Sequence, residues 1–100
     1  MKTKTKTNEP QNPRGQWLGV VFFYSSLIWA HGSTQEEAAE ACAKQAKRDL
    51  KHLFKKGAKV EWRVNLYAVN NQDWSYDQEL GIIRADGSRA ALHETLKLYA

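Results

Sequence analysis

The sequence contains few of the residues that mark secreted, membrane or phosphate-binding proteins. It has one cysteine, Cys42, and two prolines among 100 residues. A single cysteine cannot form an internal disulfide, which predicts a reducing, cytoplasmic setting. The glycines are isolated, so no glycine-rich loop is available to hold a phosphate group. The longest apolar run, WLGVVFFY, is far shorter than the roughly 20 residues of a membrane-spanning helix, and we expect no membrane segment.

Residues suited to catalysis or metal binding are equally few. His31, His52 and His93 are separated by 21 and 41 residues, without the close spacing that metal ligands show. Cys42 lies in an alanine-rich segment, where burial would make its thiol inert. No serine lies in the GxSxG setting of a nucleophile. We therefore expect a protein that is not an enzyme and that uses no metal ion and no cofactor.

Basic residues are in excess, and their distribution is uneven. The chain has 15 Lys and Arg against 11 Asp and Glu, a net charge of +4. The segment AKQAKRDLKHLFKKGAK, residues 43–59, contains seven bases and one acid, Asp49. Residues 1–16 combine the KTKTK repeat with two prolines and predict a flexible basic tail that buries no surface. The rest of the chain, residues 17–100, predicts a single domain.

Three segments have the patterns of β-strands. Residues 17–24 are apolar on both faces, which is typical of a central strand that is covered on both sides. Residues 27–32 predict a second strand that closes a hairpin, with one long bent strand as the alternative. Residues 59–69 alternate apolar and polar side chains and predict a half-buried strand. For residues 74–85 the pattern leaves strand and loop open, with a short last strand at residues 80–85.

Two further segments predict helices. A long helix is expected to begin near Ser33 or Thr34, because Glu36 and Glu37 follow at capping-box spacing, and to end at Gly57. Residues 88–99 predict a short C-terminal helix that begins after Ser88. The predicted fold is α+β in the order β-β-α-β-(β)-α: a small antiparallel or mixed sheet packed by one long and one short helix.

The exposed side of the long helix is the first candidate binding site. The 100° helical period places an apolar stripe on one side of the helix, made of Ala39, Cys42, Ala43, Ala46, Leu50, Leu53 and Phe54. It places five bases on the opposite side: Lys44, Lys47, Arg48, Lys51 and Lys55. Such a row could follow a phosphate backbone, with the N-terminal tail as a second arm. The alternative is a solvated helix face, because acids near a helix start and bases near its end match the helix dipole. Dipole matching explains where the bases lie but not how many there are.

Aromatic residues on strands and in a connector form the second candidate site. Arg63 and Tyr67 lie on the polar side of their predicted strand, where we expect exposed contacts. Trp74 and Tyr76 are surrounded by acidic residues and predict a contact loop. The alternative is that aromatic side chains fill the core of so short a chain. We expect Trp17, Phe23 and Trp62 to be such core residues.

The segment WLGVVFFYSSLIWAHGSTQEEAAEACAKQAKR, followed by KVEWRVNLYAV, resembles a pattern of small phage and mobile-element proteins. In that pattern a hairpin leads through (S/T)xEEA into an alanine-rich helix, and a third strand completes the sheet. Some anti-CRISPR proteins and some phage inhibitors of bacterial RNA polymerase are similar in this way. The resemblance is architectural, covers about residues 17–70, and implies a stoichiometric inhibitor that covers a host surface.

These patterns lead to two main hypotheses about function. The first is a non-catalytic binding protein, of the phage inhibitor type that the resemblance implies, which docks on a host protein or ribonucleoprotein complex. The alternative is a nucleic-acid-binding protein without sequence readout, which contacts DNA or RNA backbone through the basic helix face and the N-terminal tail. An exposed strand edge that pairs with itself would make the chain a homodimer, and otherwise we expect a monomer.

Overall fold

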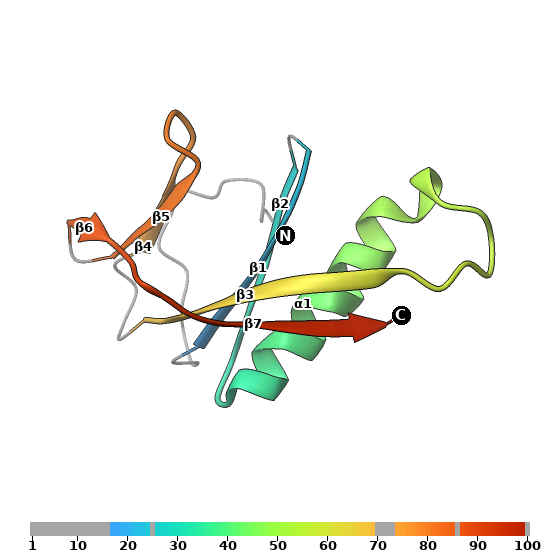
Figure 1. Ribbon diagram of the computed structural model, residues 1–100, viewed down its shortest axis with the longest axis horizontal. Coiled ribbons are helices and arrows are strands. Elements are labelled where there is room, and N and C mark those ends of the chain that lie inside the picture. The colour runs from blue at the N-terminus through green and yellow to red at the C-terminus, as the bar shows by residue number, and fades with distance from the viewer. Residues whose placement is uncertain (1–16, 25, 70–73, 86, 100) are drawn as a thin grey trace.

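A computed structural model of the chain describes residues 17–24, 26–69, 74–85 and 87–99 (Figure 1). The tail predicted at residues 1–16 and parts of the turns expected near residues 25, 71 and 86 lie outside these ranges. The elements are β1 Trp17–Phe23, β2 Ser26–Gly32, α1 Gln35–Leu50, the 3-10 helix η1 Lys51–Leu53, β3 Glu61–Ala68, β4 Trp74–Asp77, β5 Ile82–Ala85, β6 Ser88–Arg89 and β7 Leu92–Tyr99. They form a four-stranded sheet in the order β2-β1-β3-β7 and a three-stranded sheet in the order β4-β5-β6, both antiparallel. The α+β class is confirmed.

Strand β1 is one of the two interior strands of the four-stranded sheet, as its two apolar faces predict. It pairs with β2 on one side and with β3 on the other, and the β1–β2 hairpin is confirmed. Val21 on one face of β1 packs in the core beneath α1. Leu18 and Val20 on the other face pack against the small sheet. In Figure 1 the small sheet lies on the left and α1 on the right.

The start of α1 is determined by a local cap. Thr34 is the N-cap residue, and its Oγ1 accepts a hydrogen bond of 3.1 Å from the backbone N–H of Glu37. The carboxylate of Glu37 in turn accepts a bond of 3.0 Å from the N–H of Ser33. Of the two predicted caps, the second is therefore the one that forms. Loss of such a cap typically costs about 1 kcal/mol.

The first turns of α1 lie very close to the sheet because small residues meet there. A Cβ atom added to Gly32 would lie 2.4 Å from the backbone nitrogen of Ala38, so a larger residue would push the helix away. The same face of α1 carries Cys42, whose thiol donates to the carbonyl of Ile28 at 3.4 Å. Burial raises the pKa of Cys42 to about 12, as expected of a thiol inside an apolar stripe.

The small sheet covers part of the opposite face of the four-stranded sheet. Its strands β4 and β5 form a hairpin, which answers the question left open for residues 74–85. Asp77 shapes the turn, because its Oδ1 accepts hydrogen bonds from the N–H groups of Glu79 and Leu80. Trp74 and Ile83 of this sheet pack with Leu18 and Val20 in the core between the two sheets. Strands β4, β5 and β6 are thus a layer of their own packed on the four-stranded sheet, whereas β3 and β7 from the same half of the chain belong to that larger sheet.

The predicted C-terminal helix is wrong, because residues 88–99 form β6 and β7 instead. Strand β7 pairs antiparallel with β3, and the two lie side by side in Figure 1. Leu96 and Leu98 face the core beneath α1, opposite Val64 and Trp62 of β3. Leucines two residues apart suit a strand, and β3 offers a free row of backbone donors and acceptors that needs a partner. Tertiary pairing therefore overrides the helical spacing.

The long helix also ends earlier than predicted, at Leu50 rather than at Gly57. After η1, Phe54 takes an extended conformation with φ −126° and ψ 154°. Its ring lies 5.7 Å from that of Trp62 and 5.8 Å from that of Phe23. Packing in this aromatic cluster turns the chain out of the helical path. No helix in the described part of the chain has the length and apolar character needed to cross a membrane.

Candidate functional site

Two of the predicted contact residues are buried instead of exposed. Tyr67 is 8% exposed and Trp74 is 1% exposed, so neither is available for a partner. Both lie where the small sheet packs on the large one, a contact that the sequence did not reveal. Burial raises the pKa of the Tyr67 hydroxyl. Tyr76 is half-buried, with its ring 5.9 Å from that of Phe22.

The buried position of Trp74 is stabilised by a histidine that the sequence had left without a role. Trp74 Nε1–H donates to His31 Nε2 at 3.2 Å. The rings of Trp29 and Trp74 pack against the imidazole at 5.3 and 5.9 Å. Burial lowers the pKa of His31 to about 4, so the ring is neutral at pH 7 and can accept this hydrogen bond. His31 is therefore a structural residue of the interface between the sheets.

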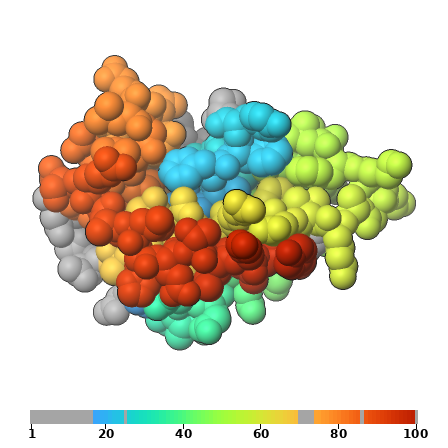
Figure 2. Space-filling view, viewed as in Figure 1, coloured from blue at the N-terminus to red at the C-terminus, as the bar shows by residue number. Residues whose placement is uncertain are grey.

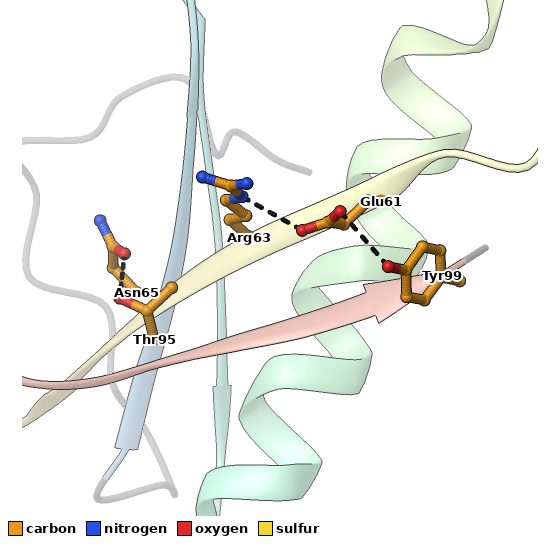
Figure 3. A network of polar contacts seen from close by, with 5 residues as sticks. All are labelled: Glu61, Arg63, Asn65, Thr95 and Tyr99. Atoms are coloured by element: carbon orange, nitrogen blue, oxygen red, sulfur yellow. Dashed lines mark hydrogen bonds and ion pairs between the residues drawn. The ribbon is translucent and has the colours of Figure 1, made fainter.

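Arg63 is exposed, as predicted, but its charge is already paired. Figure 3 shows the polar network around Arg63, which lies on β3 and β7 of the four-stranded sheet. Arg63 Nε donates to Glu61 Oε2 at 3.1 Å, and the Tyr99 hydroxyl donates to Glu61 Oε1 at 3.3 Å. The hydrogen bond from Arg63 is the main reason why the pKa of Glu61 is lowered. Thr95 donates to Asn65 at 2.8 Å beside this pair. This face therefore offers polar groups that already contact one another.

The bases that follow the middle of α1 have a different environment. We define the basic end of the molecule by its seven exposed bases: Lys44, Lys47, Arg48, Lys51, Lys55, Lys56 and Lys59. Ion pairs in the described part of the chain join Arg63 to Glu61 and Arg84 to Asp77, and none involves the basic end. Arg48 donates to the neutral side chain of Gln45, at 3.3 Å, and not to a carboxylate of the described residues. Among the described residues, the seven bases of the basic end thus form no ion pair, although one acid, Asp49, lies in the same segment.

The basic end is not the straight helical row that the sequence predicted. Lys44, Lys47 and Arg48 lie on α1, whereas Lys51 belongs to η1. Lys55 lies in the following loop, in a turn closed by the bond from Ala58 N–H to its carbonyl at 2.9 Å. Figure 2 shows this loop, in yellow-green, projecting from one end of the molecule. The bases thus form a cluster around the end of the helix.

A pocket lies inside the basic end. It has a volume of about 500 Å³ and lies between the last turns of the helix and the loop that leads to β3. Four bases contribute to its wall: Lys47, Lys51, Lys55 and Lys56. Phe54, Val60 and Trp62 contribute the apolar part of the wall. The structure therefore brings together bases that are up to nine positions apart, between 47 and 56, around one apolar surface.

Trp62 gives this pocket an unusual feature. It is 2% exposed, as expected for a core residue. Its Nε1–H is a buried donor without a hydrogen-bond partner among the described residues. Leaving a buried donor unpaired costs about 1–3 kcal/mol, so such groups are rare in folded proteins. The sequence placed Trp62 in the core correctly but gave no sign of this unpaired group.

Comparisons of the chain with protein-family models, with curated proteins and with solved structures found no match. Within the described ranges, no three His, Cys, Asp or Glu side chains are grouped so as to hold a metal ion. The basic end combines a pocket with bases that form no ion pair among the described residues, and it is the candidate functional site.

Proposed function

We propose that the chain is a non-catalytic protein that binds the phosphate backbone of nucleic acid through its basic end. The observation that carries this proposal is the cluster of seven exposed bases that form no ion pair with any described residue, four of which line one pocket. Unpaired Lys and Arg side chains release counterions from a polyanion when they contact it, which is the main source of nonspecific affinity for nucleic acid. Of the two hypotheses from the sequence, the geometry thus favours the nucleic-acid-binding protein over the docking inhibitor.

The distribution of acids indicates how a polyanion would approach. Glu36, Glu37 and Glu40 lie exposed at the opposite end of α1 from the basic end. A phosphate backbone would be repelled there and attracted to the end of the helix and the loop after it. Lysines that contact phosphates position the ligand but do not distinguish bases. We therefore propose binding without sequence readout.

A second candidate function is docking on a host protein or ribonucleoprotein complex, as a phage inhibitor of the anti-CRISPR type would do. One observation favours it: β7 is at the edge of its sheet, with Leu92 51% and Tyr99 65% exposed. Such an edge can accept a strand from a partner or from a second copy of the chain. The predicted contact loop no longer supports this role, because Trp74 is buried. Either role suits the cytoplasmic setting expected from the sequence.

The proposal is tested by fluorescence anisotropy with labelled single-stranded DNA, RNA and duplex DNA at two salt concentrations. The variant carries K44Q, R48Q, K51Q and K55Q, which neutralise four bases of the basic end. We expect affinity to fall steeply with salt for the unmodified chain. For a single strand, we expect the slope of log K against log salt to become shallower by roughly 3 in the variant, or roughly 0.7 for each lost phosphate contact.

The matched control neutralises the four described bases outside the basic end, by R63Q, R84Q, R89Q and K97Q. It removes the same charge from the chain but leaves the basic end intact. Under the proposal the control keeps a slope close to that of the unmodified chain. No binding at low salt, or equal losses in both variants, would contradict the proposal and favour docking on a protein.

A further inference from the structure

We infer that the pocket of the basic end receives one unstacked base of a single-stranded nucleic acid, so that the interface prefers single strands to duplexes. This inference rests on the proposed function and specifies the class of its ligand. It follows from two kinds of side chain that meet in the pocket. These are lysines that form no ion pair among the described residues and an apolar, partly aromatic wall.

The wall of the pocket fits a flat aromatic group beside a negative charge. Phe54 is half-buried, with its ring held against Trp62, and Val60 adds an aliphatic surface. Lys47 and Lys51 lie at the same pocket and are exposed. A volume of about 500 Å³ lies within the range of small-molecule sites, so a single nucleobase can enter. In a nucleic acid strand every nucleobase lies close to a phosphate group. The nucleobase would contact the apolar wall, and the phosphate would contact the lysines.

Trp62 lines the pocket, and its Nε1–H is a buried donor that lacks a partner among the described residues. The Nε1 atom itself is enclosed, so the pocket wall must shift before a ligand accepts a hydrogen bond from it. Each nucleobase carries carbonyl oxygens or ring nitrogens that accept hydrogen bonds at its edges, whereas an aliphatic chain has no such acceptor. A nucleobase is therefore compatible with this donor, and the features that favour it are the apolar wall and the lysines of the pocket.

The position of the remaining Lys and Arg residues favours a polymeric ligand over a small free anion. Lys44, Arg48 and Lys59 belong to the basic end but do not line the pocket. A small anion in the pocket would leave these charges unused, whereas a strand that continues past the pocket would reach them with further phosphates. In a duplex the nucleobases are paired and stacked inside the helix, so no nucleobase is free to enter the pocket. In single strands they can be splayed out and stack on aromatic side chains.

Two oligonucleotides with the same number of phosphates test the inference: single-stranded oligothymidine and an abasic strand of equal length. Both should show the same salt dependence, because both offer the same backbone. We expect oligothymidine to bind roughly tenfold more tightly, at the lower end of the effect of one base stacked on an aromatic residue. Equal affinities would overturn the base pocket but leave backbone binding intact. Failure of both strands to bind would overturn the proposed function as well.

A variant of the pocket connects the effect to the structure. Phe54→Leu removes the ring but keeps an apolar side chain, and should bring the ratio of the two affinities close to one without changing the affinity for the abasic strand. Phe22→Leu is the matched control, because Phe22 is 38% exposed and contacts Tyr76 on the other side of the sheet. It should leave the ratio unchanged. A ratio that survives Phe54→Leu would contradict the inference.

Because Phe54 also packs in the core, a second variant fills the pocket without removing a core side chain. Ala58 is exposed and lines the pocket, so Ala58→Leu places extra atoms where the base would lie. We expect the tenfold preference for oligothymidine to be lost in this variant as well, with unchanged thermal unfolding. Retention of the preference would show that the base does not enter here.

Discussion

Two buried tryptophans lie on opposite faces of the four-stranded sheet and differ in what their indole groups meet. Trp74, in the core between the sheets, donates its N–H to His31. Trp62, in the core beneath α1, has an N–H with no partner among the described residues. The first arrangement is complete within the chain and stabilises the fold. The second leaves a buried donor unpaired in a residue that also lines the pocket of the basic end, where we propose that a ligand binds.

The largest expected effect is on stability, at the Trp74 side. Trp74→Ala removes a fully buried ring from the contact between the two sheets, which should lower the free energy of unfolding by about 3–5 kcal/mol. Urea unfolding followed by circular dichroism measures this loss. The molecules that remain folded should bind nucleic acid as before, because the basic end does not contact this cluster. If the folded fraction of the Trp74→Ala chain bound nucleic acid more weakly, the core between the sheets and the basic end would not be independent of each other.

A smaller and more specific effect comes from replacing each tryptophan by phenylalanine. Trp74→Phe removes a made hydrogen bond and leaves His31 without its donor, whereas Trp62→Phe removes an unpaired donor. Since an unpaired buried donor costs about 1–3 kcal/mol, its removal offsets part of the lost packing at Trp62. We expect the Trp74→Phe chain to be less stable than the Trp62→Phe chain by about 1–2 kcal/mol in urea unfolding. Equal losses would mean that the two indole groups are not different in kind.

The smallest expected effect is a pH dependence at His31. Its pKa is lowered from 6.5 to about 4 in the folded chain, so the unfolded chain binds this proton at a higher pH. The stability contributed by neutral His31 is therefore fully present above pH 6.5 and is lost as the pH falls from 6.5 towards 4. His31→Gln keeps an acceptor for Trp74 without a titrating ring.

Urea unfolding at several pH values between 4 and 7 measures this contribution. The His31→Gln chain should lose less stability than the unmodified chain over that range. Carboxylates with lowered pKa values, Asp77 and Glu61, add their own loss near pH 4 in both chains, so the difference between the chains is the informative quantity. Identical pH profiles would show that His31 is not held in its neutral form.

Local patterns in the sequence were sufficient to predict much of the fold on the α1 side. The spacing of Thr34 and Glu37 located the start of the helix, because a cap depends only on neighbouring residues. The two apolar faces of β1 predicted a central strand, because the period of a strand determines which side chains share a face. These features need no knowledge of distant segments.

The errors occurred where distant segments decide the outcome. The leucines of residues 92–99 suit either a helix or a strand, and the free edge of β3 selected the strand. Trp74 lies among acids that suggested an exposed loop, but Asp77 is used by the turn and by an ion pair with Arg84 at 3.1 Å. The sequence predicted five of the seven bases of the basic end as binding residues, but not Lys56 or Lys59. It also did not predict the pocket, which depends on where Phe54 leaves the helix.

The most direct measurement follows the two indole N–H signals in a ¹H–¹⁵N spectrum while oligothymidine is added, with Trp62→Phe and Trp74→Phe assigning the signals. The account predicts that the Trp62 signal shifts, together with backbone signals of residues 44–62, and that the Trp74 signal stays in place. If the Trp62 signal stays in place while those of the open sheet face or of Trp74 move, the basic end is not the binding surface.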